Sequence, residues 1–143
     1  MTTKAAVAVI GGGVIGASIA YHLARGGVDD VVIIDRAPGP GAGSTGRATG
    51  GFRAQFATAI NVQMSLMSRE ALLRFNDETG VDPGFQQVGY LWLASSSAEM
   101  EAIHAANRLQ HAEGLTEARV LDRDEALEIN PLVQGEDIIG GDF

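Results

Sequence analysis

Hydrophobic residues form two short uninterrupted runs near the start of the chain, separated by a segment with helical periodicity. Residues 5–10 and 31–35 predict buried parallel strands, because strands covered on both faces are apolar along their whole length. Residues 14–25 predict a helix that ends at the glycine pair Gly26-Gly27. The order strand, helix, strand predicts a βαβ unit, and therefore an α/β fold with a parallel sheet.

The remaining pattern predicts a glycine-rich loop followed by a mixture of helices and strands. One long helix is expected over residues 57–79, with the apolar stripe Ile60, Met64 and Met67 facing a core. The other expected elements are a strand over 85–94, a helix from the cap at Ser96 to about His111, a short helix from the cap at Asp122 to Asn130-Pro131, and a strand starting at residue 138. Because that last strand begins at the chain end, we expect the domain to be incomplete.

The turn after the first strand carries the motif Gly11-x-Gly13-x-x-Gly16, and Asp35 closes the second strand. Gly11 permits a sharp turn, Gly13 lets a pyrophosphate approach the backbone, and Gly16 lets the helix lie close to the sheet. The amides at the start of the helix favour phosphate, and Asp35 can accept hydrogen bonds from a ribose. An ordinary glycine-rich turn is the alternative. The predicted cofactor contacts here are Gly11, Gly13, Val14, Ile15, Gly16, Asp35 and Arg36.

Composition and charge narrow the classes of partner. The 143 residues are 45% hydrophobic and carry a net charge of −8, which is typical of a globular chain and disfavours nucleic acid as a partner. The chain has no cysteine, so disulfides and cysteine metal sites are excluded, and we expect no metal site. We expect neither a membrane span nor a targeting segment, and a cytoplasmic location.

Residues 38–51 form a second candidate cofactor segment. A nicotinamide-binding domain would place a helix and a third parallel strand here, whereas this chain places a glycine-rich loop. Hydroxyls and exposed amides in such a loop could hold the pyrophosphate, ribityl chain and ring edge of FAD; a mobile surface loop is the alternative. The predicted contacts are Ser44, Thr45, Gly46, Arg47, Thr49, Gly50 and Gly51.

Several of these segments together resemble one family. They are residues 9–16, 34–36, 43–47 and 50–56. They are similar to the FAD-dependent D-amino-acid oxidase superfamily, and most similar to its sarcosine oxidase β-subunit and glycine oxidase-like branch. The resemblance implies a Rossmann-like FAD-binding βαβ unit with the beginning of a mixed α+β substrate domain. The implied division is residues 1–80 for the N-terminal part of the FAD-binding domain and 81–143 for the start of the substrate-binding domain.

The resemblance also implies an activity. Members oxidise the amine of a small amino acid of the sarcosine, glycine or D-amino-acid type by hydride transfer to the flavin, which oxygen or an electron carrier then reoxidises. Arg53 is the implied partner of the substrate carboxylate, and association with other oxidase subunits is a further expectation. Two alternatives stay open: an NAD-dependent Rossmann dehydrogenase, and a non-catalytic dinucleotide-binding subunit or fragment. We expect the 143-residue chain alone to be inactive.

Overall fold

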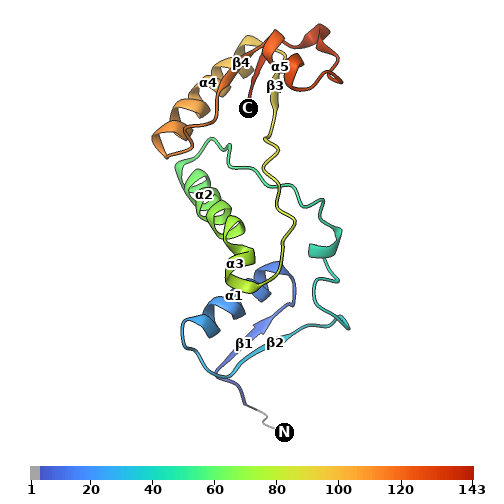
Figure 1. Cartoon of the computed structure of the whole chain (residues 1–143), viewed down its shortest axis with the longest axis vertical. Helices are drawn as coiled ribbons and strands as arrows, with labels where there is room; N and C mark the ends of the chain where they lie inside the picture. The colour runs from blue at the N-terminus through green and yellow to red at the C-terminus, as the bar shows by residue number, and fades with distance from the viewer. Residues whose placement is uncertain (1–3) are drawn as a thin grey trace. The chain divides into compact units, whose positions relative to one another are not determined.

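The chain folds into two compact units. The computed structural model describes residues 4–143; the first unit ends at Gly51 and the second comprises Phe52–Phe143 (Figure 1). The division predicted from the sequence, residues 1–80 and 81–143, concerns ligand binding rather than compactness and stays a prediction.

The first unit is built around a two-stranded parallel sheet. Strand β1 (Val7–Ile10) pairs with β2 (Val31–Ile34) in the register Val7 to Val31 through Ile10 to Ile34, and helix α1 (Val14–Arg25) connects them. The Gly11 amide extends the pairing by donating to the Ile34 carbonyl at 2.8 Å. Helix α1 begins directly after Gly13 and ends at Gly26, as the sequence predicts. The Rossmann-like βαβ unit and the α/β fold class are therefore confirmed.

The glycine-rich loop after β2 folds back onto the turn between β1 and α1. The Gly41 amide donates to the Gly12 carbonyl at 2.9 Å, and the Gly46 amide donates to the Gly41 carbonyl at 2.8 Å. A single 3₁₀ turn, η1 (Thr45–Arg47), is the only regular element of this loop. The predicted loop is thus confirmed, and backbone hydrogen bonds fix its path.

The second unit contains four α-helices: α2 (Ala59–Leu73), α3 (Phe75–Thr79), α4 (Ser97–Ala112) and α5 (Arg123–Ile129). The prediction of one helix over 57–79 is wrong, because the helix is interrupted at Arg74. Its backbone angles, φ −92° and ψ −1°, depart from regular helical values, although its amide still donates to the Glu70 carbonyl and its carbonyl accepts from the Glu78 amide. The cap predicted at Asp122 is confirmed, and together with Glu125 it forms a full capping box at the start of α5.

The core of the second unit lies on the side of α2 opposite to the predicted one. Ile60, Met64 and Met67 are exposed by 61%, 58% and 73%, so the expectation that this stripe is core is wrong. Val62 is fully buried instead and clusters with the buried side chains of Leu115 and Ala118. The partly buried side chains of Ala54, Phe56, Leu66 and Leu109 pack around this cluster.

A small antiparallel sheet completes the second unit. Its order is β3 (Trp92–Ala94), β5 (Gly140–Asp142), β4 (Val120–Asp122), with β5 in the centre and a 3₁₀ turn, η2 (Gly135–Asp137), shortly before it. The predicted strand over 85–94 is confirmed only for its last three residues, because β5 offers only three residues for pairing and Gly89 turns the chain with φ +81°. The sequence did not predict β4.

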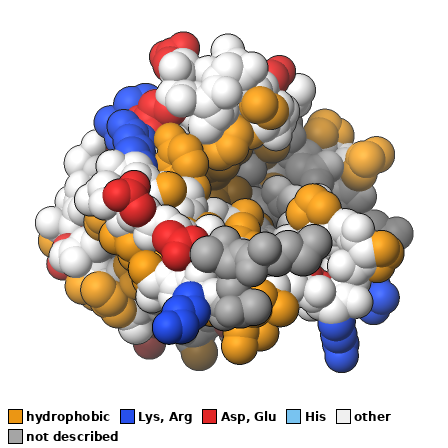
Figure 2. All heavy atoms as spheres, turned by 90° about the horizontal axis from the view of Figure 1, so that it is seen from below, with side chains coloured by type: hydrophobic (Ala, Val, Ile, Leu, Met, Phe, Trp, Pro, Cys, Tyr) orange, Lys and Arg blue, Asp and Glu red, His pale blue; other side chains and the backbone are white. Residues whose placement is uncertain are grey.

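Hydrophobic side chains also reach the surface. Figure 2 shows them between charged side chains over the visible face, and Ile10, Ile15 and Leu132 are among the most exposed, at 88%, 74% and 92%. None of the helices in residues 4–143 combines the length and the apolar character that crossing a membrane requires.

Candidate functional site

Glycine is required at one position in the turn between β1 and α1 and at one position in the first turn of α1. Gly11 adopts φ +106°, in the region that side chains disfavour. A Cβ atom at Gly16 would lie 1.8 Å from the Gly11 carbonyl oxygen, so the first turn of α1 touches the turn backbone directly. The first amides of a helix have no acceptor inside the helix. Amides of this kind favour an anion at the start of a helix.

Asp35 fixes the same turn from the end of β2. Its Oδ2 accepts a hydrogen bond from the Gly12 amide at 2.5 Å, and its Oδ1 accepts one from the Ala37 amide at 2.7 Å. These backbone donors, Ala37 first and Gly12 second, hold the pKa of Asp35 below its ordinary value. The carboxylate is therefore ionised at neutral pH. Each oxygen keeps a further lone pair, which a ribose hydroxyl could use.

The glycine-rich loop contributes Thr45 to this turn. Thr45 Oγ1 accepts a hydrogen bond from the Val14 amide at 2.9 Å. It therefore caps the start of α1, because the N-cap residue Gly13 has no side chain that could do so. A Cβ atom at Gly13 would lie 2.9 Å from the same oxygen. Gly13 and Thr45 are thus in close contact, although 32 positions separate them in the chain. The two candidate cofactor segments predicted from the sequence meet at the start of the helix.

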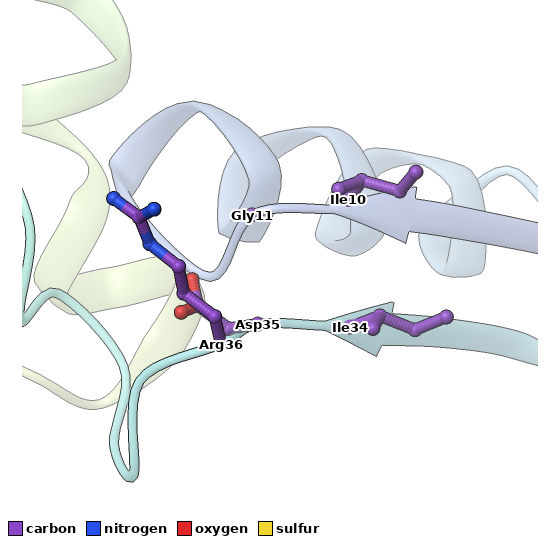
Figure 3. A pocket seen from close by; sticks show the side chains of 5 residues that line it. All are labelled: Ile10, Gly11, Ile34, Asp35 and Arg36. Atoms are coloured by element: carbon purple, nitrogen blue, oxygen red, sulfur yellow. The ribbon is translucent and has the colours of Figure 1, made fainter.

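A groove opens where the two parallel strands end. Five residues line its volume of about 380 Å³: Ile10, Gly11, Ile34, Asp35 and Arg36. Figure 3 shows Ile10 and Ile34 on the two neighbouring strands, with the side chains of Asp35 and Arg36 beyond the strand ends. The groove therefore joins an apolar floor to one carboxylate and one guanidinium, which suits a flat ring attached to a sugar.

The structure brings together only part of the predicted cofactor set. Gly11, Asp35 and Arg36 line the groove, while Gly13, Val14, Gly16, Thr45 and Gly46 lie at the adjoining turn or in the loop bonded to it. Ile15 lies in the first turn of α1 and is exposed. Ser44, Arg47, Thr49, Gly50 and Gly51 lie along the exposed part of the loop, outside the lining of the groove. Their role in cofactor binding stays a prediction.

Arg53, the predicted substrate residue, lies in the second unit among aromatic rings. Its guanidinium carbon is 4.7 Å from the ring centre of Phe56, 5.0 Å from that of Trp92 and 5.6 Å from that of Tyr90. Its Nε is buried without a hydrogen-bond partner. Such a cation, held by rings and lacking an acidic partner in residues 4–143, is suited to an incoming anion.

Sequence reasoning missed several residues that build these two places. Gly12 joins the turn to both Asp35 and the loop, and Ile10 and Ile34 form the floor of the groove. The rings around Arg53 were also missed. Tyr90 and Trp92 stand two positions apart in an apolar segment, a spacing that places side chains on one face of a strand and could have signalled a shared contact.

Metal ligands do not gather in the described part of the chain. Residues 4–143 contain no group of three or more His, Asp or Glu side chains placed to hold a metal ion.

Comparison with known families agrees with a cofactor groove of this kind. The family model described as FAD dependent oxidoreductase (DAO) matches residues 6–143. The chain belongs to the DAO family. The resemblance predicted from the sequence is confirmed, and so is FAD as the cofactor of the family. Membership favours FAD over the nicotinamide alternative.

Individual members of the family match this chain over most of its length. FAD-dependent oxidoreductase domain-containing protein 1 of Xenopus laevis is 42% identical over 102 residues, which cover 64% of this chain and 20% of that protein. Two solved structures cover 99% of this chain: L-proline dehydrogenase from P. horikoshii, with a TM-score of 0.88 and 32% identity, and glycine oxidase from Geobacillus kaustophilus, with a TM-score of 0.81 and 28% identity. This chain spans 37% and 39% of those two proteins.

Proposed function

We propose that this DAO-family chain belongs to an enzyme that oxidises the amine of a small amino acid of the sarcosine, glycine or D-amino-acid type, with FAD as the acceptor. The observation that carries the proposal is the pair of sites in one chain: a groove with the features of a dinucleotide site, and a guanidinium without an anionic partner among the described residues. The similarity to a glycine oxidase and an L-proline dehydrogenase supports an amino-acid substrate.

The residues at the groove fit FAD. Gly11 leaves open space where a side chain would stand, because a Cβ atom there would meet nothing within 4 Å. The first-turn amides of α1 other than that of Val14, which already donates to Thr45 Oγ1, would hold the pyrophosphate, and the ionised Asp35 would accept from the ribose hydroxyls. Bound there, FAD supplies the hydride acceptor for amine oxidation. The proposed contacts in the rest of the loop are Ser44, Gly46, Arg47, Thr49, Gly50 and Gly51.

Arg53 would bind and orient the substrate through its carboxylate. A guanidinium presents two parallel N–H donors to a carboxylate, which fixes direction as well as position. Orientation matters because hydride transfer requires the carbon beside the nitrogen to face the acceptor. Arg53 stands two positions after Gly51, the last residue of the predicted loop contacts.

The other predicted properties accompany this proposal. They are reoxidation by oxygen or an electron carrier, association with other oxidase subunits, a cytoplasmic location, and inactivity of the 143-residue chain alone. A non-catalytic dinucleotide-binding subunit is the alternative, and it differs from the proposal in binding FAD without turnover.

The test combines a cofactor titration with an assay of turnover. The purified chain is titrated with FAD and, separately, with NAD, and binding is followed by the visible absorbance and fluorescence of the flavin or by calorimetry. Oxidation of sarcosine, glycine and D-alanine is then measured with oxygen and with an artificial electron acceptor. The same measurements are made on the chain extended by any downstream coding sequence. Preference for NAD would refute the cofactor, and FAD binding without turnover in the extended protein would favour the non-catalytic alternative.

A further inference from the structure

Three aromatic side chains lie close to the Arg53 guanidinium, and we call Phe56, Tyr90 and Trp92 the aromatic clamp. The ring centres lie 4.7–5.6 Å from the guanidinium carbon, within the range of cation–π attraction. Tyr90 and Trp92 also contact each other, with ring centres 5.7 Å apart and ring planes inclined by 40°. All four residues belong to the second unit.

The contacts of the Arg53 guanidinium are with the rings of the clamp. An arginine at a partly buried place is ordinarily held by a carboxylate or by carbonyl oxygens. The buried Nε of Arg53 has no such partner. Contacts with the rings therefore take the place of hydrogen bonds in fixing the side chain.

This way of holding an arginine leaves its chemistry available. A carboxylate partner would neutralise the positive charge and occupy the N–H donors. The clamp rings carry no negative charge, so the positive charge of Arg53 is retained, and its buried Nε keeps an unused donor. Lysine would lose this contact geometry, because an ammonium group has no flat face.

Both sides of the contact are anchored to the sheet. Trp92 stands opposite Asp142 in the antiparallel pair β3–β5. Asp142 Oδ2 accepts a hydrogen bond from Gln55 Nε2 at 3.0 Å, and Gln110 Nε2 donates to the Phe56 carbonyl at 3.3 Å. The segment that carries Arg53 is thus tied to the strand that is paired with Trp92.

We propose that Trp92, supported by Tyr90 and Phe56, is a positioning residue that holds the Arg53 guanidinium ready for the carboxylate of the substrate. The inference rests on the proposed function, since it takes Arg53 as the carboxylate site. It adds that the ring contact sets both the direction and the affinity of that site.

The single tryptophan of the chain makes the contact directly observable. Trp92 fluorescence should change when Arg53 is replaced by lysine, and it should respond to sarcosine but not to sarcosinamide, which lacks the carboxylate. Dissociation constants for sarcosine are measured by calorimetry at fixed ionic strength. We expect Trp92→Leu to weaken binding about tenfold and Trp92→Phe to restore it to within about twofold of the parent.

A matched control separates positioning from a general loss of packing. Phe85 forms an edge-to-face pair with Phe52 at 5.7 Å in the same unit and is not among the clamp residues. We expect Phe85→Leu to leave the sarcosine dissociation constant unchanged. The double variant Arg53→Lys with Trp92→Leu should bind no more weakly than the weaker single variant, because both changes remove one contact.

The outcomes distinguish the inference from the proposed function. Saturable sarcosine binding that Trp92→Leu leaves unchanged, or that Phe85→Leu weakens equally, overturns the positioning role alone. An absence of saturable binding in both the parent chain and its extended form overturns the carboxylate site of Arg53, and the positioning role with it.

Discussion

The close contact between Gly16 and the turn backbone allows a quantitative prediction for the substitution Gly16→Ala. Two effects oppose each other. Alanine in place of glycine within a helix ordinarily stabilises the helix by about 1 kcal/mol. Against this, the added Cβ would lie 1.8 Å from the Gly11 carbonyl oxygen and 3.3 Å from Cγ1 of Val9.

The structure indicates that the steric effect is larger. Ordinary contact begins at about 3.4 Å, so the methyl group is about 1.6 Å too close to the oxygen. The atom it meets is backbone in a turn with φ +106°, which cannot rotate away as a side chain could. Overpacking of this kind costs typically about 1–3 kcal/mol, and for so short a contact we expect the upper part of that range. After the helix gain, the net loss is about 1–2 kcal/mol.

Unfolding and cofactor titrations test this expectation. Tm should fall by roughly 3–8 °C for a chain of this length, and FAD affinity should fall at least about tenfold, because the same displacement moves the first-turn amides of α1. Gly43→Ala is the control, since a Cβ there meets nothing within 4 Å and its φ is ordinary. An unchanged or raised Tm for Gly16→Ala, with FAD affinity equal to that of Gly43→Ala, would refute the reasoning.

Three further substitutions test the other contacts. Asp35→Asn should weaken FAD binding measured by titration, because one oxygen cannot accept from both the Gly12 and Ala37 amides and the ribose; equal affinity would exclude this role. Thr45→Val keeps the side-chain shape but removes the acceptor of the Val14 amide; it should lower Tm, whereas Thr45→Ser should not. Burial raises the pKa of Asp142, partly opposed by hydrogen bonds from Asn107 and Gln55, so the folded state binds the proton more tightly than the unfolded state. The unfolding free energy should therefore fall as pH rises through the range just above 3.8, and Asp142→Asn should flatten that slope; an identical slope in both proteins would contradict this.

The fold was predictable where local chemistry determines it. The limits of α1 follow from glycines on both sides, and the start of α5 follows from the capping box at Asp122. The break at Arg74 carries neither glycine nor proline, so no local signal marks it. The length of β3 depends on β5, which lies far along the chain, and sequence near residue 90 contains no information about that pairing.

The same distinction applies to the candidate sites. The motif from Gly11 to Asp35 could be predicted from the sequence, because the local backbone of the turn requires glycine and the acidic residue directly follows the next strand. The aromatic clamp joins residues 53, 56, 90 and 92, which only the folded chain brings together. The apolar stripe of α2 was assigned to the wrong face. Its period is correct for a helix, yet the periodicity alone did not determine which face is buried in the unit.

Asp35 holds the turn of the motif in place, in addition to any contact with a ligand. Its carboxylate joins the end of β2 to the turn by accepting a hydrogen bond from the Gly12 amide. The Gly12 carbonyl then accepts a hydrogen bond from the Gly41 amide, which joins the turn to the glycine-rich loop. A ribose bound to Asp35 would therefore contact the carboxylate that orders the turn. The same carboxylate is linked to the loop through Gly12. The hydrogen bonds that lower the pKa of Asp35 also keep it ionised for such a ligand. Order in the cofactor groove and affinity for the cofactor thus depend on the same carboxylate, so substitution of Asp35 should reduce both together.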